Sequence, residues 1–187
     1  MSFEDDEQEI RKITNCLDEK KDNKWVYGRE WAKYKGNVIN RLVIKLLTPY
    51  IDNCKIAEPN AFIRDNPTEF DILILKQNSN PINDYSNAFE KNDVLAIIEV
   101  KKNGFFYKKD EAENKIGAYV DKITNIGIPF FYITIRETKN YRDFTKKVFK
   151  DKKLTNNCFF LKVSESWEDE EWGKFVNAIN SSIRTYS

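Results

Sequence analysis

Val94–Val100, which reads VLAIIEV, restricts the fold more than any other segment, because it is apolar on both faces. Successive side chains of a strand point to opposite faces, so a strand that is apolar throughout must be covered on both sides. We therefore predict that this segment is a central strand of a sheet packed between two layers of helices.

The neighbouring segments alternate between helical and strand patterns. Apolar residues recur at helical spacing in four ranges, 31–47, 110–123, 141–150 and 172–183. Short apolar runs predict further strands at 70–75, 130–135 and 158–163. This order predicts an α/β fold with a mixed central sheet flanked by helices and an added C-terminal helix.

The length and the cysteines restrict the organisation of the chain. Its 187 residues fit one domain, residues 1–187, around a single core. We expect residues 1–24 to be a loose or peripheral start, since Ser2–Glu9 is acidic and poor in apolar residues. No apolar run reaches the length of a membrane span, and no secretion signal is recognisable. Three widely separated cysteines favour a reducing, cytoplasmic setting.

The chain contains no histidine, and this excludes several classes of hydrolase. Serine or cysteine hydrolases with a catalytic histidine, helical zinc proteases and histidine-based nucleases all require that residue. No phosphate-binding loop and no dinucleotide-binding glycine motif is present either. Any catalysis must therefore depend on carboxylates, lysines, tyrosines or a bound metal.

Charged residues interrupt two of the apolar strands. Glu99 and Lys101 are two positions apart, so they point to the same face, and we expect Leu95 and Ile97 to precede them on that face. Asp71 lies in the earlier strand. If the two strands are neighbours, Asp71 and Glu99 can converge on one cation, which would offset the cost of burying a carboxylate.

This set of residues suits hydrolysis of a phosphodiester. Asp71, Glu99 and the main-chain carbonyl of Val100 supply the hard oxygen ligands that Mg²⁺ or Mn²⁺ prefers. The ammonium of Lys101 can hold an attacking water or stabilise negative charge. The alternative interpretation is a solvated salt bridge between Glu99 and Lys101, with Asp71 merely beginning a strand.

The sequences EFDILIL, around Asp71, and VLAIIEVKK, ending in Glu99-Val100-Lys101, resemble the PD-(D/E)XK nuclease superfamily. The resemblance covers roughly residues 28–136. It implies the restriction-endonuclease-like fold with an αβββαβ core, and metal-dependent cleavage of phosphodiesters, usually in DNA. The proline of the motif is displaced, since Pro67 is not adjacent to Asp71. The resemblance also implies a third acidic ligand on or near the first helix, for which Glu30 and Glu58 are both candidates.

Basic residues gather in some regions although the net charge is only +1. Clusters of lysine and arginine are typical of surfaces that bind phosphates, but a solvated helix face is an equally good interpretation. The candidate nucleic-acid contacts are Lys102, Lys108, Lys109, Lys146, Lys147 and Lys150.

We therefore predict a Mg²⁺- or Mn²⁺-dependent nuclease that acts on DNA rather than RNA, in restriction, phage defence or mobile-element biology. The competing hypotheses are a non-catalytic nucleic-acid- or protein-binding module of the same fold, and an unrelated α/β domain of a protein assembly. A homodimer or a partner subunit could supply specificity, because the sequence contains no separate DNA-reading domain.

Overall fold

The structure, a computed structural model, describes residues 2–19, 28–104 and 111–186, with side chains described over 2–17, 33–104 and 111–184. No helix in these ranges is both long and apolar enough to cross a membrane. The helices are α1 (Phe3–Glu19), α2 (Gly28–Leu47), α3 (Ala112–Thr124), α4 (Lys139–Asp151) and α5 (Glu171–Tyr186). The strands are β1 (Cys54–Ile56), β2 (Ala61–Ile63), β3 (Glu69–Phe70), β4 (Ile72–Lys76), β5 (Ala88–Phe89), β6 (Val94–Asn103), β7 (Phe130–Arg136), β8 (Cys158–Phe160), β9 (Lys162–Val163) and β10 (Ser166–Trp167).

The central sheet has five strands in the order β1-β4-β6-β7-β8. β4 pairs antiparallel with both β1 and β6, whereas β6, β7 and β8 are parallel. The parallel connections run through α3 and α4, as crossovers between parallel strands usually do. The predicted mixed sheet flanked by helices is therefore confirmed, and α2, β1, β4, β6, α3 and β7 follow the αβββαβ order.

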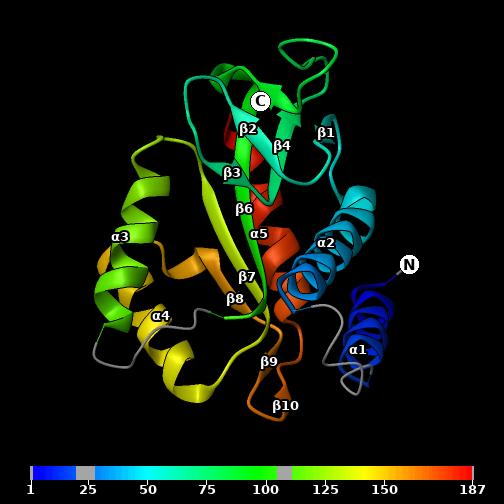
Figure 1. Cartoon of the computed structure of the whole chain (residues 1–187), viewed down its shortest axis with the longest axis vertical. Helices are drawn as coiled ribbons and strands as arrows, with labels where there is room; N and C mark the ends of the chain where they lie inside the picture. Colours follow the sequence, from blue (N-terminus) through cyan, green and yellow to red (C-terminus); the bar gives the residue numbers. More distant parts are fainter. Residues whose placement is uncertain (1, 20–27, 105–110, 187) are drawn as a thin grey trace.

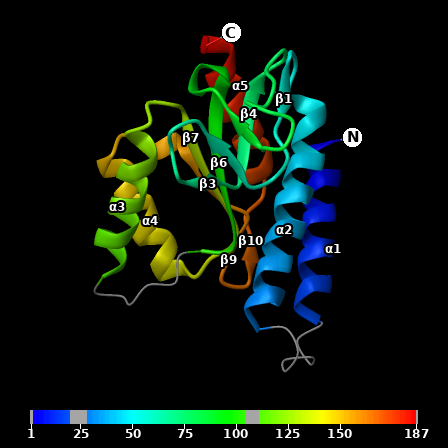
Figure 2. The same ribbon diagram turned by 45° about the horizontal axis from the view of Figure 1, so that its top comes forward.

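Strand β6 lies in the middle of this sheet and is covered on both faces, as its sequence predicts (Figures 1 and 2). One face packs against α1, α2 and α5, with Ile98 and Val100 of β6 in that core. The other packs against α3 and α4, with Ile97 in that core. Two separate apolar cores thus hold β6 in a fixed position.

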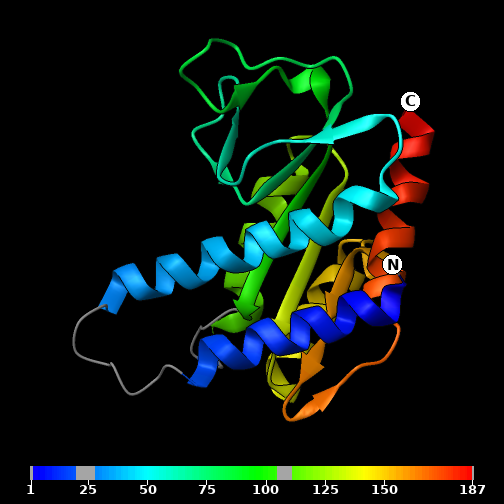
Figure 3. The ribbon, with the colours of Figure 1, turned by 90° about the vertical axis from the view of Figure 1, so that its right-hand side faces the viewer.

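Three short strands form a second sheet in the order β3-β2-β5. Each is two or three residues long, which is too short for an alternating pattern to be recognised, so the sequence did not predict them. Figure 3 shows this sheet and the N-terminal half of α2 extending on the same side of the molecule, beyond the central sheet.

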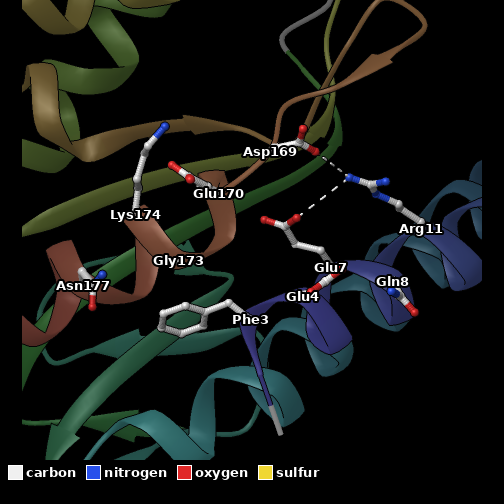
Figure 4. A pocket seen from close by; sticks show the side chains of 10 residues that line it. All are labelled: Phe3, Glu4, Glu7, Gln8, Arg11, Asp169, Glu170, Gly173, Lys174 and Asn177. Atoms are coloured by element: carbon white, nitrogen blue, oxygen red, sulfur yellow. Dashed lines mark hydrogen bonds and ion pairs between the residues drawn. The ribbon is translucent and has the colours of Figure 1, made fainter.

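The expectation of a loose start at Ser2–Glu9 is wrong, because α1 begins at Phe3 and packs into the core. Asp6 is buried and accepts hydrogen bonds from the Tyr50 hydroxyl (2.7 Å) and Trp172 Nε1 (3.1 Å). Figure 4 shows a further link beside α5, in which Arg11 bridges Glu7 and Asp169. The acidic residues thus fasten α1 to the turn that follows α2 and to α5, a contact that local sequence does not reveal. Residues 20–24 lie outside the described ranges.

We expect Asp6→Ala to lower the free energy of unfolding by about 3 kcal/mol, because the buried Trp172 N–H and the half-buried Tyr50 hydroxyl lose a charged acceptor. For a chain of this length that corresponds to a fall in Tm of about 6–12 °C, measurable by calorimetry. Glu4→Ala is the matched control, since Glu4 is an exposed acid in the same turn of α1. Equal melting temperatures for the two variants would contradict the anchoring role of Asp6.

Candidate active site

Asp71 lies where the chain leaves the second sheet at β3 and enters the central sheet at β4. The ladder between β4 and β6 ends at the pair Ile72–Ile98, so the next N–H along β6 on that side has no strand partner. This N–H belongs to Val100, and it donates a hydrogen bond to Asp71 Oδ2 at 2.9 Å. Its other oxygen, Oδ1, accepts a hydrogen bond from Asn40 Nδ2 of α2 at 3.1 Å. Both oxygens are thus held in place.

Glu99 and Lys101 project from the same face of β6, as the alternation of a strand requires. Lys101 forms an ion pair with Glu99, and its Nζ also lies 3.9 Å from Asp71 Oδ2. The structure therefore brings the three residues together, with one ammonium contacting both carboxylates. Glu99 is 6% exposed, whereas the side chains of Asp71 and Lys101 are 23% and 35% exposed. Burial and the nearby Asp71 carboxylate raise the pKa of Glu99.

Tyr119, on α3, forms a hydrogen bond with Glu99. Burial and the Glu99 carboxylate raise the pKa of Tyr119, so its hydroxyl stays protonated and can donate to the carboxylate. Tyr119 and Asn40 thus each orient one of the two acids. Sequence patterns did not single them out, because a tyrosine or an asparagine on a helix carries no signal of this role.

The expectation that Leu95 and Ile97 both precede Glu99 on its face is wrong for Leu95. The register between β4 and β6 shifts from Ile74–Ala96 to Leu75–Val94, which leaves Leu95 as an extra residue in β6. A β-bulge of this kind reverses the side-chain alternation before it. Leu95 accordingly packs in the α2 and α5 core, whereas Ile97 packs in the α3 and α4 core.

Two carboxylates and one ammonium leave this cluster with a formal charge of −1, which favours a cation. Asp71, Glu99 and the main chain of Val100 are oxygen donors of the type that Mg²⁺ and Mn²⁺ prefer. Over the described part of the chain, no group of three or more Asp, Glu, Cys or His side chains gathers as a metal centre. Among the described residues the donor set is therefore two acids, which fit a cation held by that pair.

The two candidates for a third acid differ in position. The side chain of Glu30 lies outside the described residues, and its backbone is ten residues, or about 15 Å of helix, before Asn40. Glu58 has a side chain that is 78% exposed and lies 3.9 Å from Arg41. Glu58 is not among the described residues that line the cleft around Asp71.

This cleft has a volume of about 360 Å³ and opens beside Asp71, Val100 and Lys101. Most of its other lining residues are lysines or asparagines, namely Lys33, Lys35, Asn37, Asn40, Asn60, Lys102 and Asn103, with Gly36 and Glu69 completing the walls. An Asn60–Asn37 hydrogen bond of 3.3 Å links the loop after β1 to α2. Of the two acids of the cluster, Asp71 lines this cleft and Glu99 does not. A cleft lined by lysines and amides beside Asp71 can bind an anion next to a metal ion.

The candidate nucleic-acid contacts do not all lie at this cleft. Lys102 lines it, whereas Lys108 and Lys109 lie outside the described residues. Lys146, Lys147 and Lys150 belong to α4 and line a different cavity, of about 830 Å³, between α4 and α5. Lys147 there pairs with Glu113 of α3 at 2.8 Å.

No protein-family model and no curated protein matches this sequence. Comparison with solved structures finds NucC of P. aeruginosa ATCC27853 in its cAAA-bound form, with a TM-score of 0.66 at 12% identity over 99% of this chain and 90% of that one. NucC of E. coli MS115-1, also in its cAAA-bound form, has a TM-score of 0.50 at 13% identity. That match covers 72% of this chain and 62% of the other. The likeness shows that this chain and NucC share a fold.

Proposed function

We propose that this chain is a divalent-metal-dependent nuclease that hydrolyses phosphodiester bonds, with DNA as the expected substrate. The observation that carries the proposal is the contact of one ammonium, that of Lys101, with two carboxylates, one of them buried, beside a positive cleft. Such a cluster is costly to fold unless it binds a cation or a reacting group. The shared fold with NucC, a PD-(D/E)XK-type nuclease, supports the same reaction class and suggests a nuclease in phage defence.

The residues have distinct roles in this proposal. Asp71 and Glu99 would hold the ion, and the Val100 carbonyl would be a further ligand. When bound, Mg²⁺ or Mn²⁺ lowers the pKa of a coordinated water and neutralises charge on the phosphate. Lys101, released from the carboxylates as the ion binds, stabilises the negative charge that develops on the phosphoryl oxygens.

The hydrolysis requires one water and two oriented acids. The water oxygen forms a bond to phosphorus, the bond from phosphorus to one ester oxygen breaks, and the leaving oxygen takes up a proton. Asn40 and the N–H of Val100 hold Asp71, which lines the cleft, and Tyr119 holds Glu99 through a hydrogen bond. Two copies of the chain related by a twofold axis could cut both strands of a duplex.

A cleavage assay tests the proposal. Purified protein is incubated with labelled single-stranded, double-stranded and branched DNA, and with RNA, in Mg²⁺ or Mn²⁺. We expect DNA cleavage that stops when EDTA removes the metal. Protein that is folded but inert on every substrate with both metals would overturn the proposal.

A further inference from the structure

One face of α2 lines the cleft over two helical turns. Lys33, Gly36, Asn37 and Asn40 are spaced at i, i+3, i+4 and i+7, which places them on one side of a helix, and all four line the cleft. We call these four residues the α2 cleft face. Because Asn40 contacts Asp71, the face runs outward from the acids, with Lys33 about 10 Å along the helix axis.

Gly36 is unusual in this face because none of the described residues requires a glycine there. It lies in the interior of α2, where glycine is less favourable than alanine. A Cβ added at this position would meet no atom of another described segment within 4 Å, so packing within the described part of the chain does not explain the glycine. A bare helix backbone that lines a cleft is suited to close approach by a bound molecule.

The charges beside Gly36 indicate what kind of molecule approaches. Lys33 is exposed on α2, Lys35 follows on the same helix, and Lys102 lies on the β6 side of the cleft. The chain as a whole carries a net charge of only +1, so these lysines are a local concentration of positive charge. Over the 10 Å from Asn40 to Lys33, one strand of a duplex presents about three phosphates, at one per ~3.4 Å of axis.

We infer that the α2 cleft face is the track for the sugar–phosphate backbone of the strand that is cut, with Gly36 at the closest approach and Lys33, Lys35 and Lys102 pairing with phosphates. The inference rests on the proposed function, because it assigns the substrate of that same site. It places the phosphate contacts at α2 and the end of β6 rather than on α4. Asn37 and Asn103 line the same cleft and supply amide donors to the backbone.

The test measures binding without cleavage. Fluorescein-labelled single-stranded and double-stranded DNA are titrated with the full chain in EDTA, and fluorescence anisotropy is followed over a series of salt concentrations. We expect Gly36→Ala to weaken binding about threefold and Gly36→Leu at least tenfold, while neither lowers Tm. Gly117→Ala is the matched control, because Gly117 lies inside α3, has equally open space at its Cβ and does not line the cleft. It should bind DNA as the unmodified chain does.

The lysines are tested in the same assay. Lys33→Ala combined with Lys35→Ala should reduce the slope of log affinity against log salt by about two, since each phosphate contact contributes about one. Lys146→Ala with Lys150→Ala removes the same charge from α4. The inference would be overturned if the Lys146→Ala, Lys150→Ala variant lost more DNA affinity than the Lys33→Ala, Lys35→Ala variant, or if Gly36→Leu bound DNA as tightly as the unmodified chain. A chain that cleaves nothing yet shows these binding losses would refute the proposed function alone.

Discussion

Glu99→Gln is expected to reduce DNA cleavage about 10³-fold, or by about 4 kcal/mol of transition-state stabilisation. Glutamine has nearly the same shape and can still bond to Tyr119, but it carries no charge with which to hold a divalent ion. Because Glu99 is buried with a raised pKa, a neutral side chain is tolerated there and the variant should stay folded. Single-turnover cleavage at saturating Mg²⁺ measures the effect, with circular dichroism to verify folding.

Glu58→Gln is the matched comparison for this prediction. It removes the same charge from an acid that is largely exposed and paired with Arg41, so cleavage should stay within about twofold of that of the unmodified chain, as is usual away from a site. A comparable loss in Glu58→Gln would make Glu58 a ligand. Near-normal cleavage by Glu99→Gln would remove Glu99 from the reaction.

Lys101→Met is expected to reduce cleavage about 10²-fold while it leaves metal binding intact or tighter. The ammonium offsets part of the negative charge of Asp71 and Glu99 when no metal is bound, and a divalent ion would displace it from them. Methionine keeps much of the side-chain length without the charge. It therefore no longer competes with a metal ion for the carboxylates, and it no longer offsets their negative charge. The same substitution should therefore affect folding differently with and without metal.

In EDTA, Lys101→Met should lower the free energy of unfolding by about 2 kcal/mol, less than for a fully buried pair because Lys101 is a third exposed. This corresponds to a fall in Tm of about 4–8 °C, which Mg²⁺ should reverse. Lys102→Met, one residue along β6, is the control. The difference in Tm between this variant and the unmodified chain should be the same with and without Mg²⁺. Equal effects of Mg²⁺ on the Tm of Lys101→Met and of the unmodified chain would contradict this account.

The parts of the fold that sequence could predict are those with a local pattern. The apolar run of Val94–Val100 identifies the central strand, and the two-residue spacing of Glu99 and Lys101 places them on one face. Their meeting with Asp71 depended on β4 and β6 being neighbours, which the structure shows. What could not be predicted depends on distant or irregular contacts, such as the bulge at Leu95.

Helix α1 illustrates the same limit. Its apolar residues are sparse, and its acids looked like a solvated start, yet Asp6 bonds to Trp172, which lies 166 positions away. The role of Asn40 could not be predicted either, because it depends on α2 lying against Asp71, just before β4 begins. Hydrogen bonds between polar residues far apart in sequence leave no periodic signal.

The central claim is that Asp71 and Glu99 share one divalent ion, and titration with Mn²⁺ followed by isothermal calorimetry tests it most directly. We predict one ion per chain, with affinity reduced at least tenfold in both Asp71→Asn and Glu99→Gln and preserved in Lys101→Met. Undiminished Mn²⁺ affinity in either of the first two variants would show that the pair does not hold the ion.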